Sequence, residues 1–212
     1  IGGGISSEDG SLSVASSTFI NNSANNGGGI HNTSGSLIIT DSIFTDNSVR
    51  VSGGGVLNTN GTATITNSTF SNNSAASYGG GVSNGNGNLT IVSSTFADNS
   101  ANQEGGGINN YQSTLFIVNS TFSGNSTNYG GAISTGRRNT VIVNGTLNGN
   151  SANIRGGGVF IGENGAIDLS NSIVAGNAAA EGPDIFGEVN SLSGNLVGDP
   201  QGVLGLWASD LL

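Results

Sequence analysis

Four residues whose side chains could bind a ligand directly precede glycines in this chain: Tyr78, Glu104, Tyr129 and Arg155. They follow one another at a nearly even spacing of about 26 residues, so a fold that repeats at this period brings them together. A tyrosine offers a large apolar face with a polar tip, which suits a sugar ring and its hydroxyls. We therefore predict a candidate glycan-binding strip. The alternative is a surface ion pair between Arg155 and Glu181, with the tyrosines covering the glycines.

Residues for acid–base, nucleophilic or metal chemistry are otherwise scarce. The 212 residues include one histidine, 13 acidic residues and no cysteine, so disulfides and thiolate metal sites are excluded. A Ser-His-Asp triad needs an oriented acid and nucleophile, and nothing in the sequence marks such partners for the lone His31. Asp46 and Asp98 occupy equivalent places in units two repeats apart, about 10 Å in a stacked fold, which is loose for paired catalytic carboxylates. We expect no catalytic residue, no metal and no cofactor.

Charge and hydropathy narrow the range of partners. The net charge is −9 with only four basic residues, so no positively charged stripe is available to neutralise the phosphates of nucleic acid. No run of about 18 apolar residues is present, and a membrane span within this segment is not expected. The remaining partner classes are a glycan or further copies of the chain itself.

Glycine clusters recur along the chain and set the positions of these residues. The residue after each cluster is Ile5, Ile30, Val56, Val82, Ile108, Ile133 and Val159. A second set of equivalent positions, the Phe column, comprises Phe19, Phe44, Phe70, Phe96, Phe122, Leu147 and Val174. A third set, the Asn column, comprises Asn22, Asn47, Asn73, Asn99, Asn125, Asn150 and Asn177. Such a period is typical of solenoids, propellers and arrays.

Local patterns decide which repeat fold forms. Apolar residues alternate with β-branched residues over short stretches, which indicates strands, and Gly, Asn and Ser at the joints indicate turns. No amphipathic run is long enough for the helices of helical repeats. We predict an all-β fold, a right-handed single-stranded parallel β-helix of about eight coils of 25–26 residues, because parallel crossovers strongly favour the right hand. It would cover residues 1–199, followed by an apolar tail, 200–212.

The stacked coils assign a structural role to each column. The Phe column is predicted to form an internal stack. The Asn column is predicted to bond along a corner and satisfy turn groups that no strand reaches. The glycines are predicted to occupy the tightest corner, where a positive φ or a close approach of the next coil excludes a Cβ atom.

Two stretches carry a resemblance to a known group. Asn119–Ile133 (NSTFSGNSTNYGGAI) resembles the right-handed parallel β-helix repeats of secreted bacterial surface proteins, which include the polymorphic outer-membrane-protein and CSLREA-type families. Asn171–Asp199 resembles the characteristic last coils of such proteins, with GPDI before a Ser-x-x-Gly-Asn-Leu-x-Gly-Asp closure. The resemblance covers nearly the whole chain and implies an extracellular or cell-surface location in a bacterium.

The expected function is therefore that of a structural or adhesive β-helix segment without catalytic activity, as a surface rod, an adhesin stalk or a filament subunit. One alternative is a carbohydrate-active enzyme, a polysaccharide lyase or epimerase, which would need an acid–cation cleft. Another is ice binding, which the threonines directly before the Phe column suggest. For the filament, the apolar tail with Trp207, Leu211 and Leu212 is a candidate assembly segment, either capping its own last coil or docking on the next chain.

Overall fold

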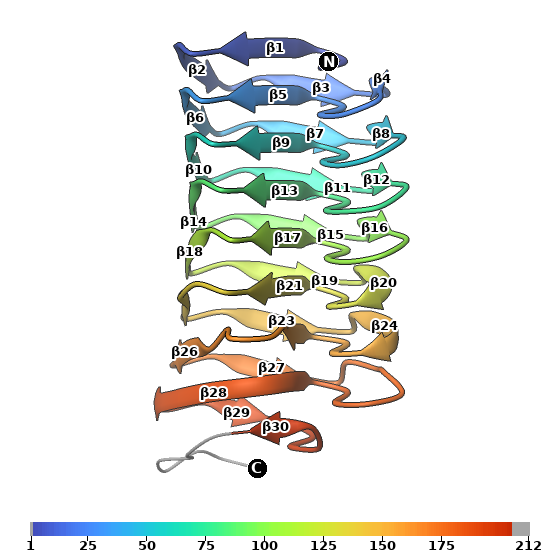
Figure 1. The fold of residues 1–212 in the computed structure, drawn as a ribbon, viewed down its shortest axis with the longest axis vertical. Helices are drawn as coiled ribbons and strands as arrows, with labels where there is room; N and C mark the ends of the chain where they lie inside the picture. The colour runs from blue at the N-terminus through green and yellow to red at the C-terminus, as the bar shows by residue number, and fades with distance from the viewer. Residues whose placement is uncertain (1, 205–212) are drawn as a thin grey trace.

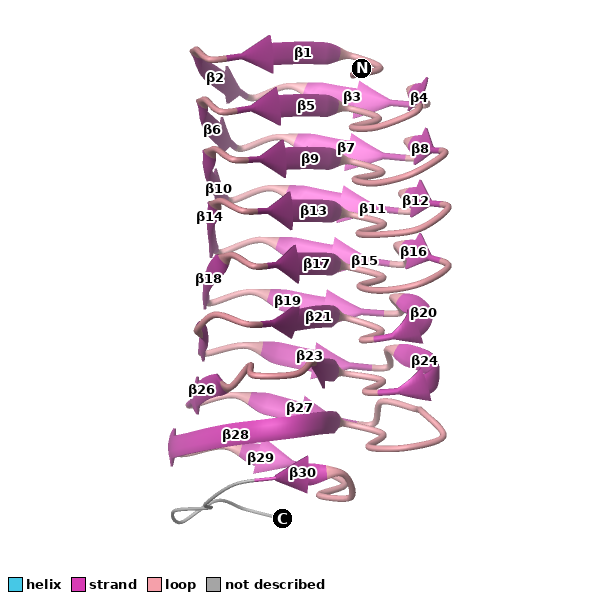
Figure 2. Cartoon of the chain, viewed as in Figure 1, coloured by secondary structure: helices cyan, strands magenta, loops and turns pink. Residues whose placement is uncertain are grey.

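The computed structural model describes residues 2–204, and these residues form an all-β parallel solenoid of about seven turns without a helix (Figures 1 and 2). In Figure 1 the chain runs leftward along the front strands, crosses to the back at the left and returns rightward behind as it descends. This winding is right-handed, as the strand crossovers predict. The tail residues Trp207, Leu211 and Leu212 lie outside the described residues.

Each turn contributes strands to up to four stacked rows, which we name sheets A to D. Sheet A contains β1 (Ile5–Glu8), β5 (Ile30–Thr33), β9 (Val56–Thr59), β13 (Val82–Gly85), β17 (Ile108–Tyr111), β21 (Ile133–Gly136), β25 (Val159–Ile161) and β28 (Ile185–Ser193). Sheet B contains β2 (Ser11–Ala15), β6 (Ser36–Thr40), β10 (Thr62–Thr66), β14 (Asn88–Val92), β18 (Thr114–Val118), β22 (Thr140–Val143) and β26 (Ile167–Ser170). The long β28 also pairs with β26 and so joins these two rows.

The other two rows close each turn. Sheet C contains β3 (Thr18–Ile20), β7 (Ile43–Thr45), β11 (Thr69–Ser71), β15 (Thr95–Ala97), β19 (Thr121–Ser123), β23 (Thr146–Asn148), β27 (Ile173–Ala175) and β29 (Leu196–Val197). Sheet D contains the short strands β4 (Ser23–Ala24), β8 (Ser48–Val49), β12 (Ser74–Ala75), β16 (Ser100–Ala101), β20 (Ser126–Tyr129) and β24 (Ser151–Arg155). The last strand, β30 (Val203–Leu204), pairs with β28.

The register of these sheets confirms the predicted repeat. β11 and β15 pair in parallel with Phe70 opposite Phe96, one period apart. Their rings stack with centroids 4.8 Å apart and planes 4° from parallel, and both side chains are fully buried. The Phe column is therefore the internal stack that the sequence predicts, continued by Leu147 and Val174 in the core.

The Asn column forms a continuous hydrogen-bonded ladder at the corner between sheets C and D. Nδ2 of Asn73 donates to Oδ1 of Asn99 at 2.9 Å and to the backbone carbonyl of Phe44 at 2.9 Å. Oδ1 of Asn73 in turn accepts from Nδ2 of Asn47 at 2.9 Å and from the backbone N–H of Asn47 at 3.1 Å. Each internal amide thereby uses both donors and both acceptor positions, which is the most that this side chain offers.

A buried carboxylate ends this ladder. Oδ1 of Asp184 accepts from the backbone N–H and from Nδ2 of Asn177, at 3.0 and 2.8 Å. Its Oδ2 accepts from the backbone N–H of Asp199 at 2.7 Å. An asparagine here would turn a donor towards that N–H, whereas a carboxylate only accepts, so Asp184 of the GPDI sequence fits the last rung.

The three glycines of one cluster have three different physical reasons. Gly53 has a φ of +72°, which side chains rarely adopt. A Cβ on Gly54 would overlap the carbonyl oxygen of Gly80 on the next coil, and one on Gly55 would lie 2.7 Å from the carbonyl oxygen of Gly81 and 2.8 Å from the ring of Phe70. Ala132 replaces the third glycine in the turn where Leu147 replaces phenylalanine. In this turn the smaller Leu147 stands opposite the extra methyl group, whereas in the next turn Gly158 is kept opposite Val174.

The last coil is shorter than the others. Ile173 of β27 pairs with Leu196 of β29, and this step along the chain is shorter than any other pairing in the same column. The eighth coil of the sequence prediction is this shortened level. Val203 of β30 packs against its core, so the described part of the predicted apolar tail 200–212 includes a short strand that pairs with β28.

Candidate functional site

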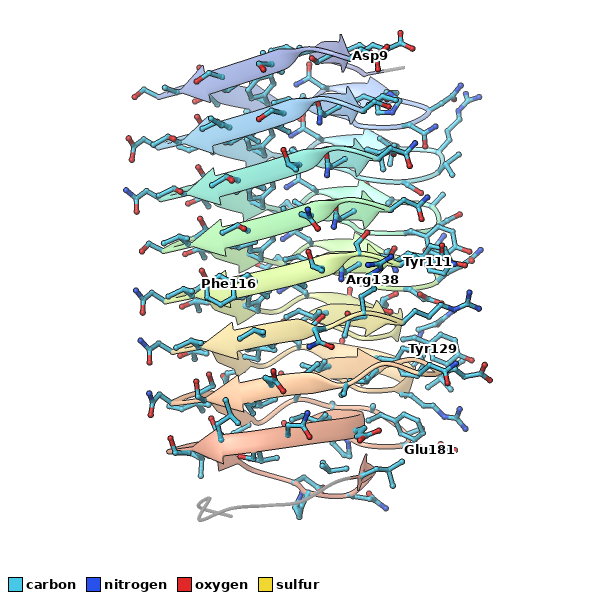
Figure 3. The ribbon with its side chains drawn as sticks, turned by 60° about the vertical axis from the view of Figure 1, so that its left-hand side comes forward. Asp9, Tyr111, Phe116, Tyr129, Arg138 and Glu181 are labelled. Atoms are coloured by element: carbon cyan, nitrogen blue, oxygen red, sulfur yellow. The ribbon has the colours of Figure 1, made fainter. Side chains whose placement is uncertain are left out.

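The predicted strip of Tyr78, Glu104, Tyr129 and Arg155 forms a column beside sheet A. Bridges link Tyr78 to Glu104 and Glu104 to Tyr129, and β20 pairs Tyr129 with Arg155. Residues one repeat apart in sequence thus become neighbours across the coils, as the spacing predicts. Figure 3 shows Tyr129 and Glu181 on the same side of the solenoid as Tyr111, well away from Phe116 on sheet B.

The carboxylate of Glu104 is held in place by neutral donors from sheet A. Its Oε2 accepts from Nδ2 of Asn109 on β17 and from Oγ of Ser134 on β21, both at 3.1 Å. Within residues 2–204 its other oxygen, Oε1, accepts no hydrogen bond, and Glu104 has no salt bridge. The side chain is thus oriented while half of its acceptor capacity remains for a ligand.

The lower half of the strip is occupied by contacts within the protein. Nε of Arg155 lies 2.7 Å from a carboxylate oxygen of Glu181, and its guanidinium lies 4.6 Å from the ring centroid of Phe186. Tyr129 contacts Phe160 with ring centroids 5.2 Å apart and planes at 51°. The ion pair considered from the sequence therefore exists. Tyr78 and Glu104 are the members of the strip that line a hollow.

That hollow has a volume of about 370 Å³ and lies on the outer face of sheet A. Leu57, Tyr78 and Tyr111 form its apolar walls, and Ser83, Glu104 and Asn109 provide its polar groups. We name it the Gly85 hollow, because Gly85 of β13 lines it and leaves open the space that a side chain would fill.

A second, smaller hollow of about 260 Å³ lies on the other side of Tyr111. Gly136, Phe160 and Glu163 line it, together with Glu104 and Tyr111, which it shares with the first hollow. The guanidinium carbon of Arg137 lies 5.9 Å from the Tyr111 ring centroid and also lines this second hollow. Tyr111 therefore separates two hollows, and the one over Gly136 contains a cation.

A polar groove runs along the turn between sheets A and B. Its volume is about 750 Å³, and it is lined by turn residues of successive coils from Asp9 to Gln112, with Arg137 and Arg138 also in its lining. Figure 3 shows Asp9 at the first coil and Arg138 near the middle of the solenoid. Gly35, Gly61 and Gly87 form its floor. At each of them an added Cβ atom would meet a backbone carbonyl oxygen of the preceding coil, so these positions stay without a side chain. The floor thus follows from backbone packing.

Other residues considered for chemistry have surface or turn roles. His31 lies on β5, where its Nε2 is 3.2 Å from the hydroxyl of Thr33, and burial lowers the pKa of its ring. Asp46 and Asp98 occupy turns with φ of +56°. In the described part of the chain, no three His, Cys, Asp or Glu side chains lie close enough to hold a metal ion.

Two features escaped the sequence interpretation. Tyr111, Phe160 and Phe186 contribute to the sheet A face, but they lie outside the strip, in columns where no single residue type persists along the solenoid. The serines before Thr-Phe form a further ladder: Ser68 N–H donates to Ser94 Oγ at 3.1 Å, and Ser94 Oγ donates to the carbonyl of Val92 at 2.8 Å. The recurring Ser in this position was the available signal.

The fold and its ladders define a parallel β-solenoid built from one repeated unit. Three of these units match the Chlamydia polymorphic membrane protein repeat, at residues 16–33, 67–85 and 119–136. Each match runs from the turn before a sheet C strand, through the glycine cluster, to the next sheet A strand. The chain is thus a β-solenoid in which three units match this repeat. No curated protein and no solved structure matches it.

Among the elements of residues 2–204, there is no helix that could serve as a membrane span.

Proposed function

We propose that the chain is an adhesive segment of a bacterial surface protein and that it acts by binding rather than by catalysis. The polymorphic membrane protein repeats support a location at the cell surface. The observation that carries the adhesive role is the outer face of sheet A, where Tyr78, Tyr111 and Phe160 line hollows on an otherwise regular solenoid. We assign this face as the contact surface.

The chemistry of the face suits binding better than bond cleavage. The acidic groups that line the second hollow, Glu104 and Glu163, are not joined there by a histidine, and the cation in that hollow, Arg137, lies over an aromatic ring. A polysaccharide lyase or epimerase needs a base aligned with charge-neutralising groups, and the sheet A face offers no such set. Oriented aromatic and polar groups on a rigid scaffold are instead what a binding surface requires.

The solenoid also supports a role as a rod that presents this face. Equivalent residues repeat about every 4.8 Å along the axis, and each turn contacts only its neighbours. Extra turns would therefore lengthen the rod without altering the site. Assembly into a filament through Trp207 and the neighbouring apolar residues stays a separate prediction, because that segment is outside the described part.

Adhesion of beads coated with the chain to animal and bacterial cells tests the proposal. We expect the wild type to retain beads on at least one surface, and the double substitution Tyr78→Ala with Tyr129→Ala to lower retention several-fold without lowering the melting temperature by more than a few degrees. Thr69→Ala with Thr121→Ala, on the outer face of sheet C, is the matched control and should adhere normally. Wild-type beads that bind no better than uncoated beads would contradict the adhesive function.

A further inference from the structure

The Gly85 hollow exists because a position that holds threonine on the two preceding coils has no side chain on β13. The outer position at the end of the strand holds Thr33, Thr59, Gly85 and Tyr111 on the successive strands β5, β9, β13 and β17, and Gly136 of β21 follows them. A Cβ added to Gly85 would meet no atom within 4 Å, and its φ lies outside the left-handed region. Neither backbone strain nor packing therefore requires glycine here, in contrast to the glycines of the corner clusters.

The walls of this hollow are suited to a flat, partly apolar group. Tyr78 contributes from the strip, Leu57 from one neighbouring coil and Tyr111 from the other. Tyr111 is 51 % exposed, so its ring stands free in solvent on the side where no protein side chain fills the hollow. Covering such an exposed aromatic ring with the apolar face of a ligand favours binding, because it removes apolar surface from water.

The polar groups of the hollow are mainly acceptors. Glu104 Oε1 accepts no hydrogen bond within residues 2–204, and the same holds for Oδ1 of Asn109, whose Nδ2 is already committed to Glu104. The hydroxyl of Ser83 is likewise without a partner among these residues. A ligand that satisfies them must bring several donors at short spacing, as the hydroxyls of one sugar ring do.

We propose that the Gly85 hollow binds one pyranose ring of a neutral glycan. The ring would lie in the place of the missing side chain, with its apolar face on Tyr111 and its hydroxyls donating to Glu104 and Asn109. The volume is near the lower end of small-molecule sites, which suits a single ring. The Glu104 charge and the net charge of −9 disfavour an anionic sugar. This inference rests on the proposed adhesive function and names its ligand.

Filling the hollow is the sharpest experiment, because the chain supplies the replacement. Gly85→Thr introduces the residue that stands at Thr33 and Thr59, so the fold is expected to tolerate it and to gain from the higher strand propensity of threonine. Titrations of the full chain with methyl glycosides of glucose, galactose, mannose and N-acetylglucosamine are expected to show binding of at least one, with Kd on the order of 1 mM. Gly85→Thr should weaken that binding at least tenfold.

Two further variants define the site. Gly136→Thr fills the hollow on the other side of Tyr111 and is the matched control, which should bind the glycoside as the wild type does. Glu104→Gln keeps the shape but removes the charge, and we expect binding to weaken about three- to tenfold because hydrogen bonds to charged groups are the stronger ones. Raising the salt concentration to 0.5 M should leave glycoside binding unchanged.

The outcomes separate this inference from the proposed function. If no glycoside binds the wild type, or if Gly85→Thr binds as well as the wild type, the inference is wrong, although bead adhesion can still stand. Salt-sensitive binding of lysine-rich peptides that Gly85→Thr abolishes would overturn it in favour of a cationic ligand between the tyrosines. Loss of bead adhesion in the presence of the bound glycoside supports both proposals.

Discussion

The outer faces of sheets A and C differ although their backbones repeat in the same way. The residues before the Phe column on sheet C are Thr18, Ile43, Thr69, Thr95, Thr121, Thr146 and Ile173. The first outward position of sheet A holds Ser6, His31, Leu57, Ser83, Asn109, Ser134, Phe160 and Phe186. Over these seven coils sheet C keeps two β-branched residue types, and Leu196 follows on the shortened last coil. Sheet A has almost no residue type in common from coil to coil.

This difference shows where the repeat stops constraining the sequence. Outward residues of sheet C are exposed or half-buried, whereas Ser83, Asn109 and Ser134 of sheet A are covered by their neighbours on the outer face. None of these residues belongs to the apolar core, so core packing does not explain why only one face varies. β-branched residues are what an exposed strand prefers for its own stability, and sheet C follows that preference. Sheet A departs from it, which is expected of a surface that contacts other molecules. The regular threonines make sheet C the surface for the alternative ice-binding function, which a thermal-hysteresis measurement would test.

The largest expected effect contrasts the core with the sheet A face. Phe96 is fully buried between Phe70 and Phe122, with ring centroids 4.8 Å from each. Phe96→Ala should lower the free energy of unfolding by about 3–5 kcal/mol. Tyr111→Ser, which truncates a half-exposed ring, should change it by no more than about 0.5 kcal/mol. Urea unfolding of both variants measures the contrast, and equal losses would contradict the division between scaffold and contact face.

The asparagine ladder should give the next largest effect. Asn99→Ala removes the acceptor for two donors of Asn73, its backbone N–H and Nδ2, at a site without solvent. We expect a loss of about 1–3 kcal/mol for an unsatisfied buried group. Asn102→Ala is the control, since Asn102 lies in the same coil with an exposed side chain. Urea midpoints that fall equally in both variants would show that the hydrogen bonds of the ladder do not contribute to stability.

The sequence contains nearly all of the scaffold but less of the contact face. Spacing alone locates the Phe and Asn columns, because stacked interior positions require the same residue type on each coil and therefore recur at a fixed spacing in the sequence. Tyr78 and Glu104 were found because they precede glycines that keep that period. Tyr111 and Phe160 carry no such mark, since an exposed residue need not repeat. The role of Asp184 depends on a local fold-back onto Asn177, which breaks the period.

A smaller effect is expected where the interior itself departs from the repeat. Gly81→Ala places a Cβ 2.7 Å from the carbonyl oxygen of Gly107 and 2.9 Å from the ring of Phe96, and such overpacking costs about 1–3 kcal/mol. Phe96→Leu makes room for that methyl group, as Leu147 does for Ala132. The double variant should therefore be more stable than the sum of the single losses predicts, by about 0.5 kcal/mol or more, as is usual for coupled neighbours. Strict additivity would mean that glycine is required at this position only to avoid the backbone of the neighbouring coil, and not to make room for the ring.

The smallest effect concerns the one histidine on the sheet A face. Burial lowers the pKa of His31 below its ordinary value, so below about pH 6.5 the unfolded chain binds a proton more readily than the folded one. The free energy of unfolding is therefore expected to fall as the pH is lowered through this range, because the folded state keeps the His31 ring neutral for longer. His31→Asn, which places the residue of the Asn109 position there, should remove this part of the pH dependence. Melting temperatures from pH 7.5 to 5.0 measure it, and curves that stay parallel in the two proteins would show that the ring titrates alike in both states.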